Sequence, residues 1–190
     1  MALFSDVFRQ TNAYAMQLGG ILGLYWCLGL LCMVAGFQVS FLHSLVPLIV
    51  LGAPLLGYFL ARYFEGQVRA DAPVDFVRAF LFCYLMYLYA TVILGGVTYI
   101  YFTMFDEGSF IEANIAQLQR PEMKELLSSP QMQSQINEAL TTTGFKSLEE
   151  MFRSVTPLML AANIVDLNLL IGVILSIPTA FFIKTKPLRK

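Results

Sequence analysis

The chain has 190 residues, of which 57% are hydrophobic and only 13% are charged, and its formal net charge at pH 7 is −1. This composition excludes an ordinary soluble domain, in which charged residues are about twice as frequent. The near balance of basic and acidic residues also argues against nucleic-acid binding, which needs a basic surface. We therefore expect an integral membrane protein whose main surroundings are the lipid bilayer.

Four stretches of the chain are long and apolar enough to span a membrane. A spanning helix needs about 20 mostly apolar residues. Only a short connection separates the first two stretches, which predicts that they form an antiparallel hairpin. We expect an all-α fold, an integral membrane four-helix bundle that occupies residues 1–190 as a single membrane domain. The expected spans are residues 14–37, 43–64, 79–105 and 157–183.

The basic residues predict how the chain is oriented in the membrane. Lys and Arg near the ends of spans collect on the cytoplasmic side. With both termini inside, eight of the twelve basic residues fall in the cytoplasm, whereas residues 106–156 carry more acidic than basic side chains. We therefore expect an N-in, C-in topology. The eight are Arg9, Arg62, Arg69, Arg78, Lys184, Lys186, Arg189 and Lys190.

Residues 106–156 have the pattern of short helices rather than of a flexible linker. Apolar residues recur in this segment at spacings of three and four. Pro121 and Pro130 stand where new helices would begin, a position that proline tolerates because its missing N–H is not needed there. Ser147 followed by Glu150 is a capping-box pattern. We expect a small helical extracytoplasmic cap between the third and fourth spans.

One polar cluster is expected inside the membrane. Asp166 lies about nine residues into the fourth span, and Asn163 lies one turn earlier on a neighbouring face. Matching depths places this pair near Thr98 of the third span, so we expect an interhelical contact that involves Thr98. Two interpretations stay open. The contact either orients two helices, as polar pairs commonly do, or forms a proton or ion site.

Small residues on the first two spans predict close helix packing. Gly19 and Gly23 form a Gly-x-x-x-Gly pair on the first span, and Ala53, Gly57 and Ala61 form a strip on the second. Strips of this kind let helix backbones approach closely. We expect them to pack within the hairpin, and a dimer face is the alternative, which leaves a homo-oligomer open.

The sequence contains no recognisable catalytic or metal-binding motif. There is no glycine-rich phosphate loop and no nucleophile or zinc-protease signature. His43 is the only histidine, and the three cysteines lie within apolar runs where neither a disulfide nor a metal cluster is expected. We expect a protein that is not an enzyme and that uses no cofactor and no metal.

Several motifs resemble one family. The order Gly-Tyr-Phe-Leu-Ala-Arg-Tyr-Phe from Gly57, then Val74-Asp75-Phe76, then Tyr99-Ile100-Tyr101 is similar to an uncharacterised bacterial membrane family, domain of unknown function 4199. The resemblance implies a multi-pass protein of the bacterial inner (cytoplasmic) membrane with no assigned catalytic residue. It also implies an association with a membrane glycosyltransferase that uses a lipid-linked sugar.

Two classes of function follow from these observations. The leading hypothesis is a non-enzymatic accessory or interaction subunit of a membrane enzyme, such as a lipid-linked-sugar glycosyltransferase or another envelope enzyme. The alternative is a small transporter or lipid-handling protein with an intramembrane polar site at Asp166. A cavity that reaches Asp166 would favour the alternative, whereas its absence would remove that hypothesis's main support.

Overall fold

The computed structural model describes residues 2–70 and 73–185 and divides the chain into two compact units. One unit, called the bundle below, consists of Met1–Thr98 and Ala161–Lys190. The other, called the connecting unit, is Tyr99–Leu160 and joins the third and fourth long helices. Within the described residues every regular element is a helix, which confirms the expected all-α class.

Four long helices dominate the described chain, and all four are long and apolar enough to cross a membrane. This number confirms the four expected spans. The first helix begins before the expected span, because the flanking residues 6–13 are also helical. Asp6 and Arg9 form an exposed ion pair one turn apart there, and the Thr11 hydroxyl donates to the Val7 carbonyl. The helices are α1 (Ala2–Ala35), α2 (Ser40–Val68), α3 (Phe76–Met104) and α8 (Pro157–Ile183).

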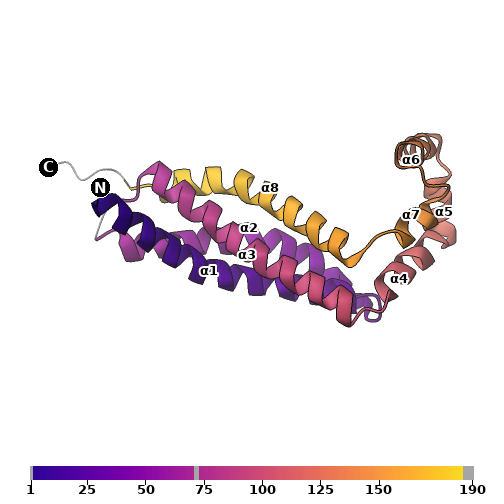
Figure 1. The fold of residues 1–190 in the computed structure, drawn as a ribbon, viewed down its shortest axis with the longest axis horizontal. Coiled ribbons are helices and arrows are strands. Elements are labelled where there is room, and N and C mark those ends of the chain that lie inside the picture. The colour runs from indigo at the N-terminus through magenta and orange to yellow at the C-terminus, as the bar shows by residue number, and fades with distance from the viewer. Residues whose placement is uncertain (1, 71–72, 186–190) are drawn as a thin grey trace. The chain divides into compact units, whose positions relative to one another are not determined.

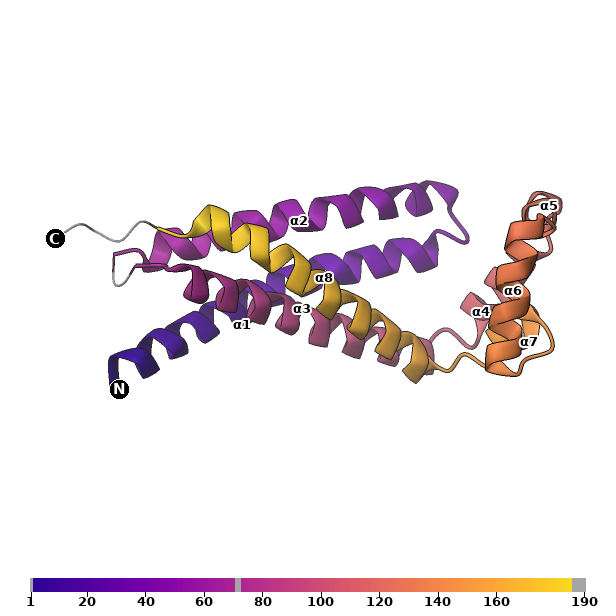
Figure 2. The ribbon, with the colours of Figure 1, turned by 90° about the horizontal axis from the view of Figure 1, so that it is seen from above.

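The beginning of α1 and the end of α8 lie at the same end of the bundle (Figure 1, Figure 2). Hydrogen bonds join Thr185, the second residue after α8, to the segment before α3. The Val74 N–H donates to Thr185 Oγ1 at 2.9 Å, and the Thr185 N–H donates to the Val74 carbonyl at 2.8 Å. We call this end of the bundle the Arg78 end, after the basic residue at the start of α3.

Helix α3 is the common neighbour of the other three helices. A Cβ at Gly19 of α1 would lie 2.6 Å from the Met86 carbonyl oxygen, and one at Gly172 of α8 would lie 2.8 Å from Tyr87 Cβ. Gly57 of α2 also faces Tyr87. The glycines of the two strips, Gly19, Gly23 and Gly57, therefore face α3, whereas Gly29 and Gly52 mark the close contact between α1 and α2.

Aromatic and aliphatic side chains fill the space around these close approaches. The rings of Phe64 and Phe82 stack between α2 and α3 with their centroids 3.9 Å apart. Both rings are fully buried, as is Leu22 of α1. The strip residues Ala53 and Ala61 are buried in the same way on α2. The core of the bundle is thus apolar, and close van der Waals packing of these side chains holds the helices together, since lipid supplies no hydrophobic driving force between spans.

The connecting unit contains four shorter helices, and three of them start at the expected signals. Pro121 and Pro130 each begin a helix, and Ser147 caps another by accepting a hydrogen bond from the Glu150 N–H at 3.1 Å. Few of its side chains are buried. Among the described residues they are Phe102, Asp106 and Ile115. The helices are α4 (Ser109–Leu118), α5 (Pro121–Leu127), α6 (Pro130–Thr143) and α7 (Leu148–Arg153).

Candidate functional site

The expected polar pair lies on the exposed face of α8. Asn163 and Asp166 are three residues apart, so their side chains project on neighbouring faces of the helix, and both are exposed. Val165, the residue before Asp166, lies against Gly95 of α3. Since consecutive helix residues point about 100° apart, packing Val165 inward turns Asp166 away from α3.

The expected contact with Thr98 is absent. Thr98 is completely buried, and its hydroxyl oxygen has no hydrogen-bond partner within the described chain. Neither Asn163 nor Asp166 makes a hydrogen bond or ion pair with any residue in 2–70 or 73–185. The third and fourth spans meet at the depth expected from the sequence, because Val165 lies against Gly95. Asn163 and Asp166, however, lie on the exposed face of α8, so these two residues and Thr98 do not form one cluster.

The exposed face of α8 has a regular spacing beyond the polar pair. Exposed residues recur along it at intervals of three and four, as in the seam between two packed helices. The opposite, buried face carries Gly172, Ser176 and Ala180 and packs toward α3. We call the exposed row the α8 seam. Its members are Asn163, Asp166, Leu170, Val173 and Ile177.

The apolar surroundings of the seam make an ionised Asp166 side chain energetically unfavourable. Asp166 lies about nine residues from the start of α8, which is ~13 Å along the helix axis. A carboxylate in the middle of a spanning helix disfavours insertion by about 2.5–3.5 kcal/mol. Side chains of this kind normally face a protein partner or a water-filled cavity. The described chain supplies no partner for Asp166.

A cavity of about 140 Å³ lies elsewhere in the bundle, among α1, α2, α3 and α8. Its lining is mostly apolar, and Asn168 is its one polar amide side chain. The Asn168 amide nitrogen donates to the Ile164 carbonyl at 2.9 Å within the same helix. Asp166 does not line this cavity. The lining residues are Trp26, Gly29, Leu30, Met33, Val46, Ile49, Val50, Leu94, Ile164 and Asn168.

The Arg78 end contains a polar network that sequence reasoning missed. Arg78 is buried, and its guanidinium donates to Thr11 Oγ1 at 3.2 Å and to Gln10 Oε1 at 2.8 Å. The guanidinium carbon also lies 5.7 Å from the centre of the Phe64 ring, a cation–π distance. In the sequence Arg78 stands directly before the third apolar stretch, where a topology signal is expected. The structure places it in the first turn of α3.

A second charged group near this end is satisfied by neighbours on its own helix. Glu65 of α2 is buried, and its carboxylate lies 3.5 Å from Arg62 and 3.7 Å from Arg69. Near the same end, the Tyr89 hydroxyl of α3 donates to Asn12 Oδ1 of α1 at 2.8 Å. The polar groups of this region therefore have partners, which makes a structural role sufficient to explain them.

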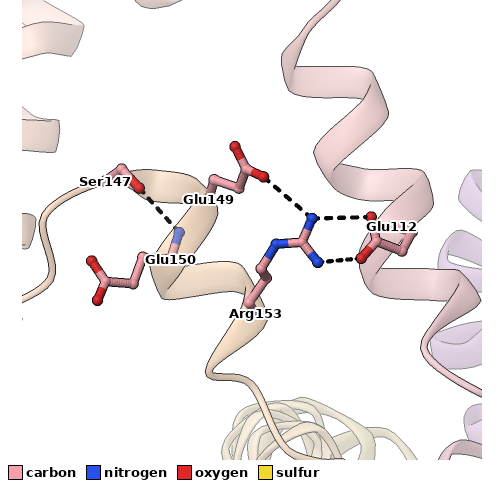
Figure 3. A network of polar contacts seen from close by, with 5 residues as sticks. All are labelled: Glu112, Ser147, Glu149, Glu150 and Arg153. Atoms are coloured by element: carbon pink, nitrogen blue, oxygen red, sulfur yellow. Dashed lines mark hydrogen bonds and ion pairs between the residues drawn. The ribbon is translucent and has the colours of Figure 1, made fainter.

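The connecting unit carries a charged contact between α4 and α7 (Figure 3). The two terminal guanidinium nitrogens of Arg153, Nη1 and Nη2, donate to the Glu112 carboxylate, and Nη2 also donates to Glu149 at 3.2 Å. These hydrogen bonds, first of all those to the Glu112 carboxylate, raise the pKa of Arg153 above its usual value. All three side chains are exposed, so the contact orients the two helices and has no catalytic geometry.

The arrangement offers no recognisable metal centre. In residues 2–70 and 73–185, no three His, Cys, Asp or Glu side chains come close enough together to hold a metal ion. The cysteines of the described chain, Cys27, Cys32 and Cys83, are unpaired. The residues that stand out chemically are therefore the exposed polar pair of α8 and the apolar cavity.

The four apolar helices define a multi-pass integral membrane protein. A family model described as "Protein of unknown function (DUF4199)" matches residues 17–185, which is most of the chain. The chain therefore belongs to this family, and the resemblance seen in its sequence motifs is confirmed. Neither a curated protein nor a solved structure matches the chain.

Proposed function

We propose that the chain is a non-enzymatic accessory subunit that binds another membrane protein through the α8 seam. The observation that carries this proposal is the exposed pair Asn163 and Asp166, which has no partner in the described chain although it lies well inside an apolar span. The partner we favour is a membrane enzyme of the cell envelope, such as a glycosyltransferase that uses a lipid-linked sugar.

Helix packing supports the choice of α8. Of the residues in the most apolar stretch of each span, 44% are buried in α3 but only 11% in α8. The buried face of α8 already packs against α3 through small residues. Helix α8 therefore keeps one side for the bundle and presents the other, with its polar pair, to whatever surrounds the bundle. Polar side chains between spans stabilise association by about 0.6–2 kcal/mol each.

The proposal includes a location, the bacterial cytoplasmic membrane, and an N-in, C-in topology with the connecting unit outside. The asymmetry of Lys and Arg supports it. Single cysteines at Glu138 and Lys184, in a chain whose three natural cysteines are replaced by Ala, test it with a membrane-impermeant thiol reagent. In intact cells Glu138→Cys should react and Lys184→Cys should not. The reverse labelling pattern would show that the topology is the opposite of the proposed one.

Affinity purification tests the accessory role. The tagged chain is extracted from its own membranes in mild detergent, and we expect one envelope enzyme to co-purify in a fixed ratio. Replacing both polar residues, Asn163→Leu with Asp166→Leu, should abolish co-purification while the bundle stays folded. Leu55→Ala, an exposed position on α2 (62%), is the control and should have no effect. Unchanged recovery from the double variant would contradict the proposal.

The alternative built on Asp166 loses its main support, because the cavity does not reach that residue. A lipid-handling role stays as the second candidate, and the apolar lining of the cavity is the observation that favours it. A cavity of about 140 Å³ with apolar walls is large enough for a small apolar group. Native mass spectrometry of the purified chain should then detect a bound lipid that Ile164→Trp, a substitution in the cavity wall, displaces. Leu167→Trp, exposed on the same helix, is the matched control. Equal lipid binding by both variants would reject this candidate.

A further inference from the structure

The α8 seam restricts the chemistry of the partner, because its two polar residues have different needs. Asn163 carries a neutral amide that can both donate and accept hydrogen bonds. Asp166 carries a carboxyl group that, when ionised, can only accept hydrogen bonds and needs a positive charge to offset its lost hydration. The identity of the group that faces Asp166 therefore decides which proteins can bind the seam.

Among the described residues of the bundle, no Lys or Arg pairs with Asp166. Helix α8 contains neither Lys nor Arg, and the basic residues of the other three long helices lie near the Arg78 end. Arg78 is already engaged with Thr11 and Gln10. The single histidine, His43, stands in the first turn of α2. If α8 of a second copy packed in parallel on this seam, Asp166 and Asn163 of one copy would face the same residues of the other rather than a cation.

We propose that the α8 seam binds a span of a different membrane protein that carries a Lys or Arg facing Asp166. This inference rests on the proposed accessory function and adds the chemical identity of the partner. The cation and Asp166 form a buried ion pair, Asn163 adds a hydrogen bond one turn away, and Leu170, Val173 and Ile177 supply the apolar part of the seam. The spacing of these five residues is that of a left-handed helix pair.

The ion pair explains why an acidic residue is stable in this place. Removing one partner of a buried pair leaves an uncompensated charge in surroundings of low dielectric constant, which is strongly unfavourable. The free subunit would therefore be inserted less favourably than its complex. The amide variant Asp166→Asn separates charge from hydrogen bonding, because an amide keeps nearly the same shape but cannot pair with a cation.

Photo-crosslinking in the native membrane tests the inference with the full-length chain. A photoreactive amino acid replaces Leu170 in the seam, and the matched control carries it at Leu55 of α2. The two leucines are 60% and 62% exposed. We expect a defined crosslink to another membrane protein from position 170 and only diffuse labelling from position 55. The crosslinked peptide should come from a span that contains Lys or Arg within one helical turn.

Three substitutions at Asp166 then identify the interaction. Asp166→Asn and Asp166→Leu should each lower the crosslink yield at least tenfold, whereas Asp166→Glu, which keeps the charge, should retain at least half. Circular dichroism and thermal unfolding of the purified variants should match the parent chain, because Asp166 makes no contact inside the described bundle.

The outcomes of these experiments test the accessory function and the partner's cation separately. If position 170 gives no more crosslinking than position 55, the accessory function itself fails. If position 170 crosslinks a partner but Asp166→Asn retains the full yield, partner binding stands and the cation is rejected. A crosslink to a second copy of the chain, or to a span without Lys or Arg near the attached residue, also overturns the cation inference.

Discussion

The bundle and the connecting unit are built on different interactions. In the bundle, helices approach through glycine, as at Gly19 and Gly172, and large rings such as Phe64 and Phe82 are fully buried. In the connecting unit most side chains are exposed, and α4 and α7 are joined by the charged contact of Arg153 with Glu112. The bundle is thus stabilised by packing, and the connecting unit by caps and surface charges.

This difference predicts in which unit a substitution should lower the free energy of unfolding more. A buried group in the bundle has no access to water if its partner is removed, so the free energy of unfolding should fall sharply. An exposed group in the connecting unit can bind water instead, so the loss should be small. The following four experiments test this ranking in order of expected effect.

The largest effect is expected for Arg78→Leu. It removes the hydrogen bonds that Thr11 Oγ1 and Gln10 Oε1 accept from the guanidinium, and hydrogen bonds from a charged donor are each worth about 1.5–3 kcal/mol. We expect the free energy of unfolding to fall by about 3 kcal/mol in a detergent titration. Arg9→Leu, whose side chain is 84% exposed, is the control and should change it by less than about 1 kcal/mol. Equal effects would break the comparison.

The next effect is expected for Gly19→Ala. The added Cβ would meet the Met86 carbonyl oxygen, which is backbone and cannot rotate away, so α1 must move from α3. Overpacking of this kind costs about 1–3 kcal/mol. The adjacent Gly20→Ala meets nothing within 4 Å and is the matched control. Thermal unfolding of both variants in the same detergent checks the prediction, and a Tm for Gly19→Ala as high as that of the control would refute it.

A smaller effect is expected for Ser147→Ala in the connecting unit. This change removes the hydroxyl that accepts from the Glu150 N–H at the start of α7, and the loss of such a cap costs about 1 kcal/mol. Hydrogen exchange of the α7 amides should accelerate, while exchange in α1 and α3 should not change. Ser134→Ala in the middle of α6 controls for the loss of a hydroxyl. Faster exchange throughout the bundle would show that the two units are not separate in stability.

The smallest effect is expected for Arg153→Gln. Its ion pairs with Glu112 and Glu149 are exposed and are screened by salt. Hydrogen exchange of α4 and α7 should rise slightly at low salt, and the difference from the parent chain should vanish in high salt. Arg120→Gln, which removes an exposed charge with no ion pair in the described chain, should show no such salt dependence. A difference that persists at high salt would mean that Arg153 acts through packing instead.

Much of the fold could be predicted from the sequence because its signals are local. Apolar length identifies the four spans, and Pro121, Pro130 and Ser147 mark helix starts through their own backbone chemistry. The start of α1 is harder to predict from the sequence, since residues 6–13 are mostly polar and are compatible with either a helix or a loop. The expectation of a single membrane domain over residues 1–190 stays a prediction.

The contacts between helices were harder to predict. A Gly-x-x-x-Gly pair at Gly19 shows that a backbone approaches closely, but it does not identify α3 as the helix that approaches. Helix α8 is apolar on all sides, so its sequence has no periodicity that would turn Asp166 toward or away from Thr98. Arg78 stood where a topology signal is expected, and burial among partners from α1 and α2 could not be deduced from that position.

The central place of α3 has a consequence for how the protein is made. A ribosome completes α1 and α2 before α3 exists, so Gly19, Gly23 and Gly57 reach the membrane before the helix that packs against them. The contacts within the hairpin, such as that of Gly29 with Ile49, can form at once. Assembly of the complete bundle must wait for the third helix to emerge.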